Sequence, residues 1–189
     1  MKLRAAFVCK AITLFLILPA LATASGQSGA PSPSTQDSIS RAIRDTWDGA
    51  KRNLKESADQ MPEADYAFRP TEQVRTFGQI IAHVAGANYV FCSPARGEKT
   101  PFEEDHFEKT AKTKADIVKA LDQSIAYCDA AFAALTDRTA AEPITMPFGM
   151  GNAARASTLI RNVGHLQEHY GNLVTYFRIK GMVPPSSRR

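Results

Sequence analysis

The sequence lacks the features that mark several common protein classes. It has only three cysteines among 189 residues, and none belongs to a Cys-x-x-Cys pair, so they form no recognisable metal or redox motif. No alternation of apolar and polar residues predicts a long strand, and no internal repeat is present. The composition, 44% hydrophobic and 22% charged, is that of an ordinary globular chain. We therefore expect a single globular domain, with a tail.

The chain also lacks an apolar run of the ~20 residues that a membrane-spanning helix needs. The run at residues 12–22 is shorter, follows three basic residues and precedes the small residues of Ala22-Thr23-Ala24. This layout predicts a secretory signal peptide over residues 1–24, cleaved after Ala24, with an uncleaved anchor as the alternative. The mature protein is then periplasmic or secreted and has no stable membrane insertion.

An excess of one charge is missing as well, once the signal is set aside. The chain has 23 Lys and Arg and 19 Asp and Glu, a formal net charge of +4. Three basic residues and no acidic ones lie in the signal, so 20 basic and 19 acidic residues remain, a net charge of +1. This balance gives no reason to expect nucleic acid as a partner.

Two cysteines remain after cleavage, Cys92 and Cys128. Export makes a disulfide between them chemically permissible. Their spacing does not define their geometry, and a domain of this size does not need a disulfide to fold. A disulfide and two free thiols both remain open.

Residues 25–36 contain only Ser, Gly, Pro, Ala, Thr and Gln, which predicts a flexible leader. The folded domain is expected over residues 37–186, with 187–189 as a tail. Apolar residues at intervals of three and four, together with capping residues and prolines, predict four amphipathic helices. They are expected at about residues 38–60, 76–92, 113–135 and 154–180.

Proline and glycine mark the connections between these helices. Two prolines forbid regular structure in residues 61–75, where Tyr66 and Phe68 are expected to pin the chain onto the domain. Pro94 is expected to end the second helix and open a polar loop to residue 112. Residues 136–153 are expected to be irregular, with a short strand or extended segment at 144–146. The pattern indicates an all-α four-helix bundle.

Three of the four histidines fall at informative positions. His165 and His169 are four residues apart, so they lie on one helix face, one turn apart. His83 lies among apolar residues on a face expected to point inward, where a buried imidazole needs a polar partner. One histidine on one helix and a His-x3-His pair on another are typical of a metal site in a bundle core. The alternative is three hydrogen-bonded core histidines, and His106 is expected to be a solvated loop residue.

Residues 165–169, His-Leu-Gln-Glu-His, also match the H-x-x-E-H string of inverted zinc peptidases. That site needs an acidic ligand further downstream, and none of the residues after His169 is Asp or Glu. The peptidase arrangement is therefore excluded. Glu168 remains a candidate to orient a histidine, with a solvated helix residue as the alternative.

The stretches that carry the histidines resemble the DinB/YfiT-like superfamily of metal-binding four-helix bundles. They are residues 66–70 (Tyr-Ala-Phe-Arg-Pro), 74–85 (Val-Arg-Thr-Phe-Gly-Gln-Ile-Ile-Ala-His-Val-Ala) and 165–181, followed by a Pro-Pro pair. The resemblance covers about residues 38–186 and implies an up-down-down-up bundle. It places one divalent metal ion on His83, His165 and His169. A homodimer is a further expectation of the resemblance alone.

Three neutral imidazoles leave a cation its full double charge and at least one open position, as in catalytic sites. Such ligation suits Zn, Ni, Co or Fe, with Mn less favoured. A cation held in this way acidifies a bound water or thiol. The family includes thiol-dependent transferases, but export argues against this chemistry because the cytosolic thiol pool is not maintained outside the inner membrane.

The leading interpretation is therefore a metal-dependent enzyme, a hydrolase or an S-transferase, acting on a small molecule. Two alternatives remain open: a non-catalytic metal-binding protein of the cell envelope, and a structural bundle with a vestigial triad. Asn88 is a second candidate to orient a histidine. Arg75, Trp47 and Tyr170 are candidates to line a pocket, although each also fits a structural role.

Overall fold

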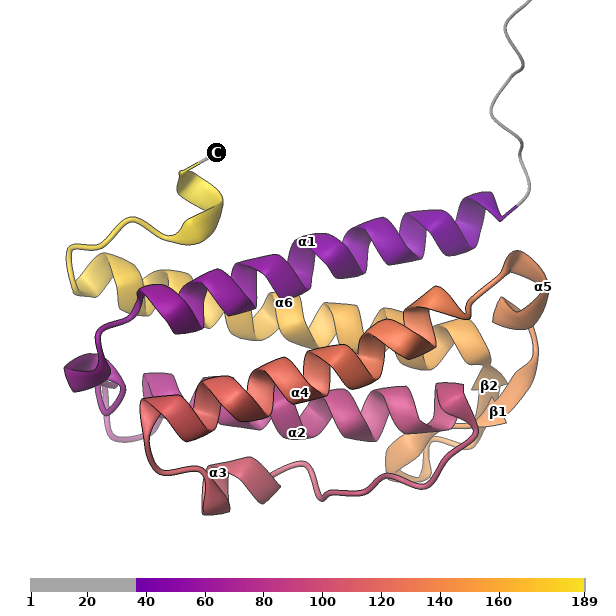
Figure 1. The fold of residues 1–189 in the computed structure, drawn as a ribbon, viewed down its shortest axis with the longest axis horizontal. Helices are drawn as coiled ribbons and strands as arrows, with labels where there is room; N and C mark the ends of the chain where they lie inside the picture. The colour runs from indigo at the N-terminus through magenta and orange to yellow at the C-terminus, as the bar shows by residue number, and fades with distance from the viewer. Residues whose placement is uncertain (1–36, 189) are drawn as a thin grey trace, which may run out of the picture. The chain divides into compact units, whose positions relative to one another are not determined.

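The computed structural model describes residues 37–188, which form a bundle of four long helices (Figure 1). The expected signal peptide, residues 1–24, and the expected leader, residues 25–36, lie outside the described residues. The long helices are α1 (Ser38–Gln60), α2 (Phe77–Arg96), α4 (Lys114–Ala133) and α6 (Arg155–Ile179). The shorter elements are α3 (His106–Thr110), α5 (Asp137–Ala140), β1 (Pro143–Thr145), β2 (Asn152–Ala154) and three 3-10 turns, η1 (Glu63–Asp65), η2 (Pro147–Gly149) and η3 (Pro185–Ser187).

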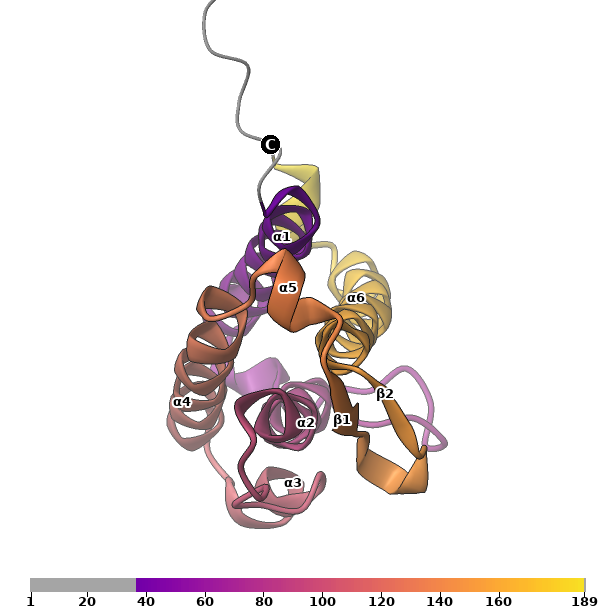
Figure 2. The ribbon, with the colours of Figure 1, turned by 90° about the vertical axis from the view of Figure 1, so that its right-hand side faces the viewer.

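The helix directions confirm the predicted up-down-down-up arrangement. In Figure 1, α2 and α4 run the same way, and the segment that joins them, which contains α3, returns along the outside of the bundle. Figure 2 looks along the bundle and shows α3 outside α2, with the β1–β2 hairpin beside α2 and α6. Within residues 37–188, no helix combines the length and the apolar character that crossing a membrane requires.

Aromatic packing fills the core between the helices. Trp47 of α1 stacks on Phe132 of α4 with ring centroids 4.5 Å apart, and Phe77 of α2 meets Phe177 of α6 edge to face. All four side chains are at most 1% exposed. Burying side chains of this size stabilises a fold by about 1.5–3 kcal/mol each. Ile39, an apolar residue at the start of α1, is 64% exposed and lies outside this core.

The start of α1 is capped from elsewhere in the bundle, and not by the side chain of its own N-cap residue. Asp37 has a left-handed backbone and makes no side-chain cap. The carboxylate of Asp137 instead accepts from the backbone N–H of Ser40, at 2.7 Å, and of Ile39. Asp37 in turn accepts from the N–H of Asp137 at 2.8 Å. The two helix starts therefore satisfy each other's free N–H groups, which no local pattern could reveal.

The prediction that Pro94 ends the second helix was wrong, because α2 continues to Arg96. Pro94 lies in the last turn, where its missing N–H removes a single helical hydrogen bond. Gly97 then ends the helix with a left-handed backbone (φ 71°), and its N–H donates to the carbonyls of Pro94 and Ser93. The capping boxes of Thr76 with Gln79 and of Thr113 with Asp116 both form.

The segment after α4 is more regular than its composition suggested. Residues 137–140 form the short helix α5, which the sequence reading missed. β1 pairs antiparallel with β2, and Pro143 lies opposite Ala154. The expected strand at residues 144–146 thus corresponds to β1. The hairpin brings the 3-10 turn η2 beside α2.

Cys92 and Cys128 form a disulfide that joins α2 to α4. Their Cα atoms are 5.4 Å apart, and neither side chain is exposed. The sequence left this pairing open because it depends on the face that each helix presents to the other.

Replacing both cysteines by alanine should lower the free energy of unfolding by about 3–4 kcal/mol, because the disulfide closes a long loop in the unfolded chain. Urea titration of both proteins without reductant measures the difference. Adding reductant should lower the free energy of unfolding of the unmodified protein, because the disulfide is reduced once the chain unfolds. The double variant has no disulfide, so reductant should not change its stability. Equal stability of the two proteins without reductant would contradict the prediction.

Candidate metal centre

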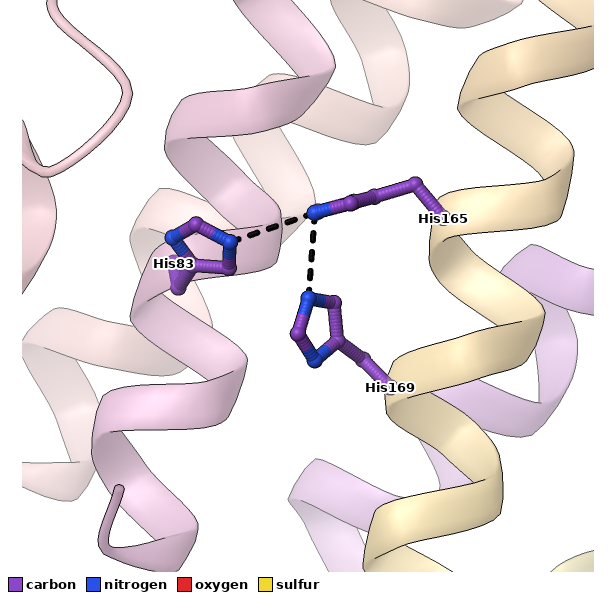
Figure 3. Close-up of side chains that lie close together, drawn as sticks. All are labelled: His83, His165 and His169. Atoms are coloured by element: carbon purple, nitrogen blue, oxygen red, sulfur yellow. Dashed lines mark hydrogen bonds between the residues drawn. The ribbon is translucent and has the colours of Figure 1, made fainter. Parts of the chain in front are cut away.

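Three histidines converge between α2 and α6, as Figure 3 shows. His83 Nε2 lies 3.1 Å from His165 Nε2, and His169 Nε2 lies 3.0 Å from the same nitrogen of His165. Their candidate ligand atoms all fall within 4.8 Å of one another. The structure therefore brings together the three residues that the sequence selected.

Helix packing explains this convergence. α2 is buried along almost its whole length, which places His83 inside the bundle at 6% exposure. α6 packs along α2 and presents His165 and His169, one helical turn apart, toward it. His169 is 8% exposed, so the imidazoles of His83 and His169 are both largely shielded from water.

Glu108, which was not predicted from the sequence as a site residue, holds the ring of His83 from outside the triad. His83 Nδ1 donates to Glu108 Oε1 at 3.0 Å, and Glu108 Oε2 accepts from Arg75 Nε, also at 3.0 Å. A carboxylate on one ring nitrogen keeps the proton there and leaves the other nitrogen, Nε2, with its lone pair free. The only sign in the sequence that Glu108 faces the bundle was the four-residue spacing of Phe107 and Ala111. Both residues pack against the core and so orient α3.

Hydrogen bonds between neutral rings cannot satisfy the three facing nitrogens. When neutral His83 donates its Nδ1 proton to Glu108, its Nε2 can only accept. Neutral His165 has at most one proton on Nε2, so that proton cannot serve both His83 and His169. If His169 donates instead, the contact between His83 and His165 has no proton. With three neutral imidazoles, one of the two contacts of about 3 Å therefore has no hydrogen bond in either case, and a cation at the centre removes this conflict because each Nε2 can direct a lone pair at it.

The electrostatics keep the α6 histidines neutral. Burial, together with neighbouring His169, His83 and the charge of Arg75, lowers the pKa of His165 from 6.5 to about 3. Burial, with His83 and Arg75, lowers the pKa of His169 from 6.5 to about 4. Neutral imidazole is the form that ligates metal, so the donor set fits a divalent cation.

Of the other predicted site residues, only Arg75 lies at the site, where it pairs with Glu108. Asn88 is buried and donates to Ser124 Oγ of α4 at 3.0 Å, so it does not orient a histidine. Glu168 is exposed on α6. Trp47 belongs to the core and donates to Asp129, and Tyr170 bonds Ser186 near the C-terminal turn. His106 is half-buried on α3 and stacks on Phe102.

Two clefts reach the site. One, of about 780 Å³, is bordered by His83 and by residues of the α2–α3 segment, with Phe148 at its edge. The other, of about 740 Å³, is bordered by His169 and Tyr176, and Arg75 borders both. Phe148 is 60% exposed and has a left-handed backbone (φ 55°), a strain that is rare for an aromatic residue and frequent near functional sites.

Comparison with known proteins assigns the chain to a family. The chain matches the DinB superfamily over residues 46–173, more than half of its length. It belongs to this superfamily. The family and the all-α bundle that the sequence predicted are therefore confirmed. No curated protein matches this chain.

Solved structures share the fold at low sequence identity. A DinB-like protein from Bacillus cereus ATCC 10987 has a TM-score of 0.60 and 16% identity, covering 77% of this chain and 95% of that one. A protein assigned to the DinB family from Exiguobacterium sibiricum 255-15 has a TM-score of 0.57 and 20% identity, covering 75% and 91%. A mycothiol-dependent maleylpyruvate isomerase has a TM-score of 0.60 and 14% identity, covering 71% of this chain but only 60% of the isomerase. At these identities the likeness concerns the fold alone.

The metal-free DinB-superfamily protein should lose stability as the pH falls below 6.5. Both α6 histidines take up protons near pH 6.5 in the unfolded chain, but only near pH 4 and pH 3 in the folded domain. The unfolded state therefore binds more protons in this interval, and the free energy of unfolding should fall by roughly 1–2 kcal/mol per pH unit. Above pH 6.5 this contribution is fully present.

Urea titrations in chelator between about pH 7 and pH 5.5 test this, because Asp and Glu titrate mainly below this interval. His165→Ala should reduce the slope, and His106→Ala should leave it unchanged. A flat profile in the unmodified protein would refute the prediction.

Proposed function

We propose that this DinB-superfamily protein binds one divalent metal ion on His83, His165 and His169 and is a metal-dependent enzyme acting on a small molecule. The observation that supports the proposal is the convergence of three Nε2 atoms, two of them on buried histidines, whose contacts neutral imidazoles cannot all satisfy by hydrogen bonds. The ion would be Zn, Ni, Co, Fe or Mn, since imidazole nitrogen ligates all of them. When bound, it would supply Lewis acidity that lowers the pKa of a water or thiol beside it.

The chain's own residues would prepare the site. Glu108 holds the ring of His83 in one orientation, and Arg75 fixes that carboxylate in turn. Partners of this kind commonly raise metal affinity by about 10–100-fold. The cleft beside His83 combines apolar borders, Phe102 and Phe148, with charged groups next to the histidines. It suits a small molecule that has an apolar body and one polar reacting group.

We infer that the nucleophile is water, so that the reaction is a hydrolysis in an exported protein. The buried disulfide supports export, because such bonds persist in oxidising compartments. Low-molecular-weight thiols are not maintained there in the reduced state. The second candidate is thiol transfer, which is favoured by the structural likeness to a mycothiol-dependent isomerase.

The metal should be measurable directly. Purified mature protein loaded with Zn²⁺ or Ni²⁺ and then desalted should retain about one ion per chain, whereas His83→Ala should retain little, because two imidazoles remain. Elemental analysis gives the ratio. His106→Ala is the matched control, since it removes a histidine outside the triad, and it should retain the ion. Equal metal in the His83→Ala variant would remove the proposal.

The nucleophile can be assigned by competing assays. Metal-loaded protein should release p-nitrophenol from p-nitrophenyl esters, and His83→Ala should lose this activity together with its metal. In parallel, the protein is incubated with a low-molecular-weight thiol and an electrophilic alkene. Conjugation that depends on His83, without ester hydrolysis, would favour the transferase. Bound metal without either reaction would favour a non-catalytic metal-binding protein.

A further inference from the structure

One acidic side chain outside the histidine triad approaches its facing nitrogens. Glu104 Oε1 lies 3.8 Å from His83 Nε2, the same nitrogen that faces His165. Glu104 precedes α3, and its side chain is 34% exposed in the cleft beside His83. Glu108 contacts the other ring nitrogen of His83, so the two carboxylates approach opposite sides of one imidazole. The role of Glu104 is therefore distinct from that of Glu108.

The backbone that carries Glu104 is seated on α2 at a glycine. A Cβ added to Gly86 would lie 1.9 Å from the carbonyl oxygen of Glu104 and 2.7 Å from its carbonyl carbon. Only glycine permits this approach, because a backbone segment cannot give way as a flexible side chain can. Gly86 is three residues after His83 on α2, so the contact fixes Glu104 at the height of the triad.

The distance from Glu104 to His83 is compatible with a shared cation. Protein nitrogen and oxygen ligands lie about 2.1 Å from an ion such as Zn²⁺, so two ligands of one ion are separated by at most about 4.2 Å. The 3.8 Å between Glu104 Oε1 and His83 Nε2 is within this limit. The carboxylate does not lie within 4.8 Å of all three histidine nitrogens, so the partly exposed Glu104 side chain has to turn toward the triad to share the cation. In the described residues, Lys109 is paired with Asp105 and Arg75 with Glu108, and the imidazole of His83 is the ion-pair partner of Glu104.

We propose that Glu104 is a fourth protein ligand of the cation, held in place by the contact of its backbone with Gly86. This inference rests on the proposed metal site. The carboxylate lowers the net charge of the centre from +2 to +1 and adds an oxygen donor beside three nitrogens. The site should therefore bind divalent ions more tightly than three histidines alone, and it should accept oxygen-preferring ions such as Mn²⁺.

The test compares metal binding by Glu104→Gln and Glu103→Gln. Glu103 is the adjacent carboxylate, exposed in the same cleft, and its amide variant is the matched control. Dissociation constants for Zn²⁺ and Mn²⁺ are measured by competition with a chelating dye, and absorption spectra are recorded with Co²⁺ as a probe of coordination. Glu104→Gln should weaken binding by about tenfold or more and change the Co²⁺ spectrum. Glu103→Gln should match the unmodified protein in both.

A second pair of variants tests the positioning. Gly86→Ala should displace the Glu104 backbone and reproduce the weaker binding and altered spectrum of Glu104→Gln. Gly49→Ala is the control, since a Cβ at Gly49 meets nothing within 4 Å, and it should bind metal as the unmodified protein does. Circular dichroism of each metal-free variant establishes that it is folded.

The outcomes separate this inference from the proposed function. If the unmodified protein binds no Zn²⁺, Mn²⁺ or Co²⁺, the proposed metal site itself fails. If it binds them and Glu104→Gln binds equally well with an unchanged Co²⁺ spectrum, the three-histidine site stands and the assignment of Glu104 is overturned.

Discussion

The packing of α2 against α6 is the constraint on which the rest of the structure depends. It buries His83 and His169, sets the spacing of the three Nε2 atoms and dehydrates the imidazoles enough to keep the α6 pair neutral. Each of these effects follows from burying an apolar helix face, and none needs a metal to form. The candidate metal site is therefore a consequence of the fold, because packing brings together three imidazole nitrogens whose contacts neutral rings cannot all satisfy by hydrogen bonds.

The sequence predicted those parts of the structure that depend on local spacing. The four-residue separation of His165 and His169 has a short-range physical cause, and so do the starts of α2 and α4, where capping boxes form at Thr76 and Thr113. The family resemblance then supplied the pairing of α2 with α6. The histidine triad was predictable because two of its members share a helix and the third lies on a buried face.

The parts that were missed are those fixed by contacts between distant segments. Glu108 and Glu104 lie in a stretch that reads as a polar loop, and their place beside His83 follows from the seating of that stretch on Gly86. Asn88 failed as a site candidate for the same reason, since the helix face that it occupies meets α4. The cap that Asp137 supplies to α1 spans nearly a hundred residues and leaves no local trace.

The disulfide has a consequence for how the bundle opens. Cys92 and Cys128 tie α2 to α4, and a cation on the triad would tie α2 to α6. Among the long helices of residues 37–188, α1 alone would then be held by packing, hydrogen bonds and ion pairs, with neither kind of crosslink. Local fluctuations should therefore detach α1 first and leave a three-helix remnant with the metal site intact, so amide hydrogens of α1 should exchange before those of α2.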